Sequence, residues 1–239
     1  MNEETRSIGP SLDKYFFDKK VTCPICGDVF SVRAVKTSML RVVSRDSDSR
    51  AVFSEINPLF YDVWLCNRCG FAAPNKHWEE DNLTNAQKAL IKDKITPKWN
   101  PKNYPPEHTL EIALERYKLA LLNAMVRMGL PSETAMICLK MAWILRGTGS
   151  DEQEQKYLLQ ARNDFRKSFG DEDFPIAGMD EPTFMYMVGE LSRRVGDFTE
   201  ATLWFGQVLS NPNAKQNLKE RIRDMRELMA EEIKKQPQA

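Results

Sequence analysis

Two short cysteine motifs constrain the fold of this chain more than any other feature. They are Cys23-Pro24-Ile25-Cys26-Gly27 and Cys66-Asn67-Arg68-Cys69-Gly70, so a glycine directly follows each Cys-x-x-Cys turn. Two cysteines with this spacing can bind the same ion, and glycine tolerates the positive φ that closes such a turn. Two turns together supply four thiolates, the ligand set of a closed structural zinc site. We therefore predict that one Zn²⁺ is bound by Cys23, Cys26, Cys66 and Cys69.

Other interpretations of these cysteines stay open. The four residues could simply be buried or disulfide-bonded, iron could replace zinc because Fe–S₄ and Zn–S₄ sites share a geometry, or His77 could replace one cysteine as a ligand. Four thiolates leave no coordination position for water, which favours a structural metal over a catalytic one. The fifth cysteine, Cys138, lies in an apolar helical stretch and is expected in the core.

The sequence also indicates the cellular compartment in which the protein is found. Residues 1–10 are polar and lack the apolar segment of a signal peptide, and no stretch approaches the ~18 apolar residues of a membrane span. We therefore predict a cytoplasmic protein with no membrane partner, in which thiols stay reduced. Lys plus Arg and Asp plus Glu each number 34, so the net charge gives no indication of nucleic-acid binding.

A proline-rich stretch divides the chain. Residues 96–106 contain four prolines, which exclude a regular helix or a central strand. We interpret this stretch as a linker between a metal-binding module at residues 1–95 and a helical domain at residues 107–239. In the first module, strand patterns occur at 29–36, 40–45 and 60–66, with turns at 46–49 and 57–58. They predict a zinc ribbon, that is, a small antiparallel sheet with a cysteine turn at each end.

The helical part begins with a capping box. Thr84-x-x-Gln87 predicts a short helix that still belongs to the first module. Beyond the linker, apolar residues recur at helical spacing from Leu110 to Met128. Further helices are expected to begin at Ser132, Asp151, Pro182, Asp197 and Ala214, and Gly170 is expected to end the third helix of this part. The last helix, over 214–235, is apolar on one face only and suits the end of a helical stack.

One pair of these helices has the spacing of a tetratricopeptide repeat, which is two antiparallel helices of about 34 residues. The pattern consists of Met185, Gly189, Gly196, Ala201 and Phe205. Gly189 and Ala201 would allow close approach of the helices, Gly196 would supply the turn, and Phe205 would fill the space beside them. We therefore predict an α+β fold: a small zinc-ribbon β module followed by an all-α array of antiparallel helical hairpins, tetratricopeptide-like in character.

The same segments resemble a known family. They are VTCPICG at 21–27, LRVVSRDSD at 40–48, NPLFYDVWLC at 57–66 and CGFAA at 69–73, in that order. They are similar to the bacterial domain-of-unknown-function family 2225, and the resemblance is most specific in the first eighty residues. It implies a cytoplasmic protein whose paired cysteine turns continue into tetratricopeptide-like helices. Because no activity is established for the family, it implies no mechanism.

Charged residues in and near the predicted ribbon form a second candidate site: Arg41, Arg45, Asp46, Asp48 and Arg68. The arginines could contact phosphates while Phe60, Tyr61 and Trp64 stack on bases. The two arginines and two aspartates of residues 41–48 could also form a polar site beside the metal. We favour a solvated sheet face whose arginines and aspartates pair internally and whose aromatic residues form a small core.

Catalytic motifs are not evident. The chain has no phosphate-binding loop, dinucleotide-binding glycine motif, His-Glu-x-x-His or Gly-x-Ser-x-Gly sequence. It has only two histidines, His77 and His108, and we assign no special role to His108. We therefore name no catalytic residue, although carboxylate chemistry stays open.

These observations favour a metal-stapled protein-interaction scaffold, whose helical array binds a protein or peptide. Two alternatives remain. A nucleic-acid-binding zinc ribbon predicts an affinity that falls steeply with salt. An enzyme with an active site between the two domains predicts a ligand-sized cleft lined by converging polar groups.

Overall fold

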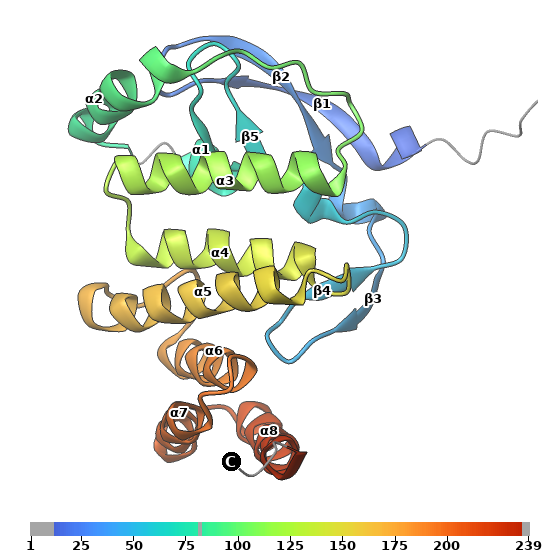
Figure 1. Ribbon diagram of the computed structural model, residues 1–239, viewed down its shortest axis with the longest axis vertical. Coiled ribbons are helices and arrows are strands. Elements are labelled where there is room, and N and C mark those ends of the chain that lie inside the picture. The colour runs from blue at the N-terminus through green and yellow to red at the C-terminus, as the bar shows by residue number, and fades with distance from the viewer. Residues whose placement is uncertain (1–11, 81–82, 236–239) are drawn as a thin grey trace, which may run out of the picture.

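The computed structural model describes residues 12–80 and 83–235. It is an elongated molecule with most strands at one end, stacked helices toward the other, and one further hairpin beside the middle helices (Figure 1). Residues 1–10, on which the signal-peptide argument depends, lie outside the described ranges. Within those ranges, no helix combines the length and the apolar character that crossing a membrane requires.

Six short strands form three separate antiparallel hairpins. Strand β1 (Phe16–Thr22) pairs with β2 (Val29–Val35), β3 (Val42–Arg45) with β4 (Ala51–Phe53), and β5 (Val63–Leu65) with β6 (Ala72–Pro74). The strands therefore do not form the single sheet that the sequence predicts. Each cysteine turn instead connects the two strands of one hairpin, β1–β2 or β5–β6, and the two hairpins pack on each other through side chains rather than through strand pairing.

Four short 3₁₀ helices interrupt the module: η1 (Leu12–Tyr15), η2 (Thr37–Met39), η3 (Pro58–Tyr61) and η4 (Thr96–Lys98). Helix η3 explains why the strand predicted at 60–66 begins only at Val63. The Asn57 side chain accepts a hydrogen bond of 3.1 Å from the Leu59 amide, and Pro58 fixes φ at the first helical position. The chain therefore makes a helical turn at 58–61, where the apolar alternation alone indicates a strand.

In the described part of the chain, eight α-helices follow the strands: α1 (Asn75–Glu80), α2 (Asn85–Lys94), α3 (Leu110–Val126), α4 (Pro131–Leu145), α5 (Asp151–Asp171), α6 (Glu181–Arg194), α7 (Phe198–Ser210) and α8 (Gln216–Lys235). Helices α4 and α5 pack as one antiparallel pair and α6 and α7 as another (Figure 1). The predicted α+β class, with small β-hairpins followed by antiparallel helical pairs, is confirmed.

Some helix ends agree with the sequence and others do not. The capping box of α2 is present, since Gln87 N donates to Thr84 Oγ1 at 3.2 Å and Thr84 N donates to Gln87 Oε1 at 3.1 Å. Ser132, however, does not cap α4. The helix begins one residue earlier, at Pro131, and the Ser132 hydroxyl donates to Glu172 at 2.6 Å. Helix α5 also continues through Gly170 to its end at Asp171.

Helix α4 is buried on nearly all sides because it lies between two packed layers. Ile137 and Met141 contact the apolar face of α3, whereas Cys138 and Leu139 belong to the core formed with α5 and α6. The fifth cysteine is therefore a core residue, as its apolar surroundings in the sequence indicate.

The proline-rich stretch and α3 both lie against the hairpin module. Val63, Leu65 and Ala72 share one apolar core with Ala113 and Tyr117 of α3. The division of the chain at 96–106 stays a prediction, but the two parts it separates are in extensive contact.

The predicted repeat residues lie where α6 and α7 meet. A Cβ atom at Gly189 would lie 2.7 Å from Cε1 of Phe205, so the ring packs directly on the glycine backbone. Ala201 and Phe205 are fully buried, and Gly196 has φ +81° in the turn between the helices.

This close approach predicts an effect on stability. Gly189→Ala is expected to destabilise the protein by about 1–2 kcal/mol, because the overpacking penalty exceeds the gain of about 1 kcal/mol in helix propensity. Gly206→Ala in α7 is the matched control, since no atom lies within 4 Å of its added Cβ, and it is expected to stabilise. Urea denaturation measures both. An increase in the midpoint for Gly189→Ala would show that the ring does not occupy this position.

Candidate metal centre

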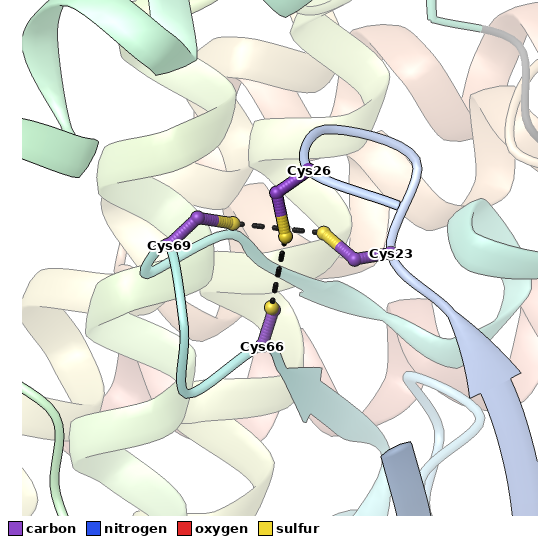
Figure 2. Close-up of side chains that lie close together, drawn as sticks. All are labelled: Cys23, Cys26, Cys66 and Cys69. Atoms are coloured by element: carbon purple, nitrogen blue, oxygen red, sulfur yellow. Dashed lines mark hydrogen bonds between the residues drawn. The ribbon is translucent and has the colours of Figure 1, made fainter. Parts of the chain in front are cut away.

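The four cysteine side chains of the two turns point toward a common centre (Figure 2). All four Sγ atoms lie within 4.8 Å of one another, and the Cys23–Cys69 and Cys26–Cys66 pairs are 3.6 Å apart. A disulfide requires about 2.05 Å between sulfurs, so the disulfide interpretation of these cysteines is wrong. A tetrahedron with metal–sulfur bonds of about 2.3 Å has edges of about 3.8 Å. The cluster thus has the dimensions of a four-thiolate metal site.

The backbone of the two turns is the same. In the first, Gly27 N donates to Cys23 O at 2.9 Å, and in the second, Gly70 N donates to Cys66 O at 2.9 Å. The two glycines have φ values of +73° and +77°, which only glycine adopts readily. Each Cys-x-x-Cys-Gly motif therefore presents its two sulfurs on one side of a tight turn, as its sequence predicts.

A second layer of contacts holds the second turn in place, and much of it comes from beyond residue 95. The Trp99 indole donates to Asn67 O at 2.9 Å, and its ring fills the space in which a Cβ at Gly70 would stand, 2.7 Å from Cγ. The Thr96 hydroxyl donates to Cys69 O at 3.1 Å, and Asn123 of α3 donates to Gly70 O at 3.2 Å. The stretch 96–106 thus holds the second cysteine turn in place and also connects the hairpin module to the helices.

The surroundings of the sulfurs are apolar. Cys23, Cys66 and Cys69 are buried, and the cluster packs against aromatic and aliphatic residues that include Trp64, Phe71, Trp78 and Ile91. A low local dielectric strengthens the attraction between a cation and thiolates and excludes competing water.

The pKa values of the clustered cysteine thiols depend on one another, because their side chains interact through hydrogen bonds. A hydrogen bond from Cys23 and one from Cys69 lower the pKa of Cys66 to about 2, whereas hydrogen bonding with Cys66 raises the pKa of Cys23 to about 12. Hydrogen bonds with Cys23 and Cys66 also raise the pKa of Cys69. One thiolate is therefore stabilised by neighbouring thiols, and a bound metal ion must displace the remaining protons.

The histidines lie outside the cluster. His77 Nε2 is 4.0 Å from the Glu133 carboxylate of α4, and within the described ranges the sulfur cluster is made of cysteines alone. The hypothesis that His77 replaces a thiolate is therefore not needed. His108 stacks on Tyr61, with ring centroids 4.6 Å apart, at the start of α3.

The tip of the β3–β4 hairpin lies against the helices rather than beside the metal cluster (Figure 1). Asp48 is fully buried and contacts Arg146 Nη2 at 2.6 Å and the Trp143 indole at 2.9 Å. Asp46 contacts Arg146 Nη1 at 2.6 Å. Burial alone would raise the pKa of Asp48, but Arg146 and Arg194 outweigh it and hold that pKa below its usual value.

Other helices hold the same tip. Ser47 O accepts hydrogen bonds from the Tyr186 hydroxyl at 2.9 Å and from Arg221 of α8 at 2.7 Å, and the Ser47 hydroxyl donates to the buried Glu190 at 2.5 Å. No pattern in the sequence indicates these pairs, because the partners are 95 to 175 residues apart.

The three predicted arginines of the polar surface are more exposed. Arg41 and Arg45 lie on the solvent side of the β3–β4 hairpin. Arg68, 68% exposed, lies 3.7 Å from Asp28 between the two cysteine turns. A role of these residues in phosphate contact stays a prediction. The two aspartates, by contrast, form ion pairs mainly with arginines of the helices, Arg146 and Arg194, whereas the favoured interpretation paired them with arginines of the ribbon.

Comparison with known proteins adds one finding. Residues 16–229 match the model of a family described as "Uncharacterized protein conserved in bacteria (DUF2225)". No curated protein and no solved structure matches the chain significantly. The matched range contains both cysteine turns and the helical array up to the last turns of α8. The chain therefore belongs to the DUF2225 family of bacterial proteins.

Proposed function

We propose that this protein is a zinc-stapled scaffold for protein interactions, in which a structural Zn²⁺ holds the hairpin module and the helical array binds an apolar segment of a partner protein. The four converging, mostly buried sulfurs support the metal. Four thiolates fill a tetrahedral shell, so the ion would cross-link the tips of β1–β2 and β5–β6 without an open position for substrate. Iron fits the same shell, and absorption in the visible range separates the two metals. A cytoplasmic location, which the sequence predicts, would keep the thiols reduced.

An exposed apolar surface on the helical array supports the proposal that the protein binds a partner. Leu122, Met125, Met128 and Leu130 fall within nine residues at the end of α3 and the following loop, and each is at least 48% exposed. Beside them, a groove of about 600 Å³ runs between α3, α4 and α5, with Leu121, Met125 and Tyr157 among its walls. Contiguous apolar surface of this kind marks interaction sites, and flexible methionines adapt to partner side chains.

The β3–β4 hairpin limits which face of the array a partner can use. Its tip already occupies the surface formed by Arg146, Glu190, Arg194 and Arg221. The groove between α3, α4 and α5 has no such intramolecular occupant among the described residues, and so we place the partner there.

The test is a comparison of three tagged full-length proteins expressed in bacterial cells. The groove variant carries Leu122→Glu and Met125→Glu, and the control carries Leu203→Glu, because Leu203 is 63% exposed on α7. All three positions are solvent-exposed, so circular dichroism is expected to be unchanged. We expect the same protein partner with wild type and control, and its loss with the groove variant by more than tenfold.

Each pull-down is divided into nuclease-treated and untreated halves. A partner that survives nuclease and depends on the groove supports the proposal. A partner retained equally by all three proteins contradicts the groove. Recovery of nucleic acid, with protein lost after nuclease treatment, would instead favour the exposed arginines Arg41, Arg45 and Arg68 as the working surface.

A further inference from the structure

A second cleft, of about 520 Å³, lies where the β1–β2 hairpin, the proline-rich stretch and the start of α3 meet. Its walls include Tyr61 and Trp64 from the hairpin module, Tyr104 from the proline-rich stretch, and His108 and Arg116 from α3 and the residues before it. Its volume falls in the range of small-molecule sites, and it combines aromatic walls with a few polar groups.

Arg116 is the cation that distinguishes this cleft. Its Nε donates to Val63 O at 3.1 Å, its Nη1 contacts His108 Nε2 at 3.2 Å, and its guanidinium lies 5.5 Å from the centre of the Tyr104 ring. In residues 12–80 and 83–235, no carboxylate lies within ion-pair distance of it. Burial without a counter-ion lowers the pKa of Arg116 to about 10. A half-buried guanidinium without a carboxylate is costly unless a ligand supplies the missing charge.

His108 does not supply that charge. Its Nδ1 lies 2.8 Å from Phe60 O, and because a carbonyl oxygen only accepts, the proton is on Nδ1. Nε2 is therefore the acceptor for Arg116 Nη1. Burial, followed by the charge of Arg116, lowers the pKa of His108 to about 4, so the ring is neutral at pH 7. It orients the guanidinium and leaves the remaining N–H groups of Nη1 and Nη2 for another acceptor.

Several unpaired donors border the same cleft. Six buried side-chain polar atoms of the described residues have no hydrogen-bond partner, and three of them belong to cleft residues: Arg33 Nε, Trp64 Nε1 and the Tyr104 hydroxyl. All three are donors, and buried donors are rarely left unpaired in native proteins.

The neighbouring charges indicate how much negative charge is missing. The other two cations of the cleft already have carboxylate partners, since Arg33 contacts Asp13 at 2.5 Å and Lys102 contacts Glu115. Asp18 also lines the cleft but makes no ion pair with Arg116, whose charge therefore has no direct carboxylate partner among the described residues. One oxyanion group, which a guanidinium binds through two parallel hydrogen bonds, would neutralise it.

We propose that this cleft is a binding site for a small organic anion, whose single carboxylate or phosphate group is held by Arg116 and Tyr104 and whose body lies against the aromatic walls. The site is separate from the cysteine cluster and from the apolar groove, so the experiment that tests it is independent of the proposed scaffold function.

The experiment titrates the purified full chain with inorganic phosphate in one arm and acetate in the other, at pH 7 and constant ionic strength with chloride. Two-dimensional NMR follows the side-chain N–H signals of Trp64 and Arg116. We expect saturable shifts of these signals with at least one probe, and the probe that binds more tightly identifies the oxyanion group.

Variants separate a specific site from general charge effects. Arg116→Gln is expected to weaken binding at least tenfold. Tyr104→Phe is expected to weaken it about fivefold, the value of one hydrogen bond. Arg41→Gln, an exposed arginine on the hairpin, is the matched control and should bind as wild type does. Shifts that do not saturate with either probe, or that persist unchanged in both Arg116→Gln and Tyr104→Phe, would overturn the proposal.

Discussion

Cys66→Ser is expected to abolish stoichiometric metal binding and to unfold the hairpin module at the temperature at which the wild type is folded. Structural zinc contributes about 10–16 kcal/mol of apparent binding free energy in small zinc domains, and this is folding free energy when the site forms only on folding. The total stability of a domain is about 5–15 kcal/mol. The strands β5 and β6 have only three residues each, so the hairpin relies on the metal and on its contacts with α3 to stay folded.

The loss of folded structure is expected to extend to α3 but not to the helical pair of α6 and α7. Asn123 of α3 donates to the backbone of the second turn, and Tyr117 shares the core of β5 and β6. Hydrogen exchange should therefore become fast in β5, β6, α2 and α3, whereas the pair α6 and α7, whose cores lie elsewhere, should keep its protection.

Elemental analysis of the purified protein measures the metal, and it also separates zinc from iron. Cys138→Ala is the matched control, because Cys138 is a buried cysteine of α4 outside the cluster. It should lower stability modestly and leave the metal content at one equivalent. Full metal content in Cys66→Ser, or equal loss in Cys138→Ala, would contradict the four-cysteine site.

Asp48→Ala is expected to destabilise the protein by about 3–5 kcal/mol, because it leaves buried donors of Arg146 and of the Trp143 indole unpaired at about 1–3 kcal/mol each, although Asp46 and Glu154 still contact Arg146. Asp48 is fully buried at the tip of the β3–β4 hairpin, where it accepts from both Arg146 and Trp143. Removing one member of a buried ion pair lowers the free energy of unfolding by more than the intact pair contributes to it, since the other charge stays desolvated.

A double-mutant cycle in urea measures this interaction. Arg146→Met alone should also be costly, but Asp48→Ala combined with Arg146→Met should cost less than the sum of the two single changes, with a coupling of about 1–3 kcal/mol. Arg45→Gln, exposed on the same hairpin, is the control and should change stability by less than about 0.5 kcal/mol. Strictly additive single and double changes would show that the hairpin tip is not held by this pair.

The features that the sequence predicts well are those set by local chemistry. The Cys-x-x-Cys-Gly turns have the glycine conformations that their spacing requires, and Thr84 and Asp197 cap the helices that follow them. Where a stronger local signal competes, the simpler pattern fails: Pro131 displaces Ser132 as the start of α4, and Asn57-Pro58 converts part of a predicted strand into η3. These outcomes depend on neighbouring residues only, and in retrospect the competing signals are also visible in the sequence.

The sequence by itself determined the four cysteines of the cluster, the family and the succession of short strands followed by helical pairs, because each depends on local motifs and local periodicity. The tertiary structure alone decided the partners of isolated polar groups. Asp48 meets Arg146, 98 residues away, and Arg116 reaches the same cleft as Tyr61 while finding no carboxylate. Sequence spacing does not predict such contacts. The energy of a buried charge depends on which groups the fold brings within hydrogen-bond distance and on how much water the fold excludes from that charge.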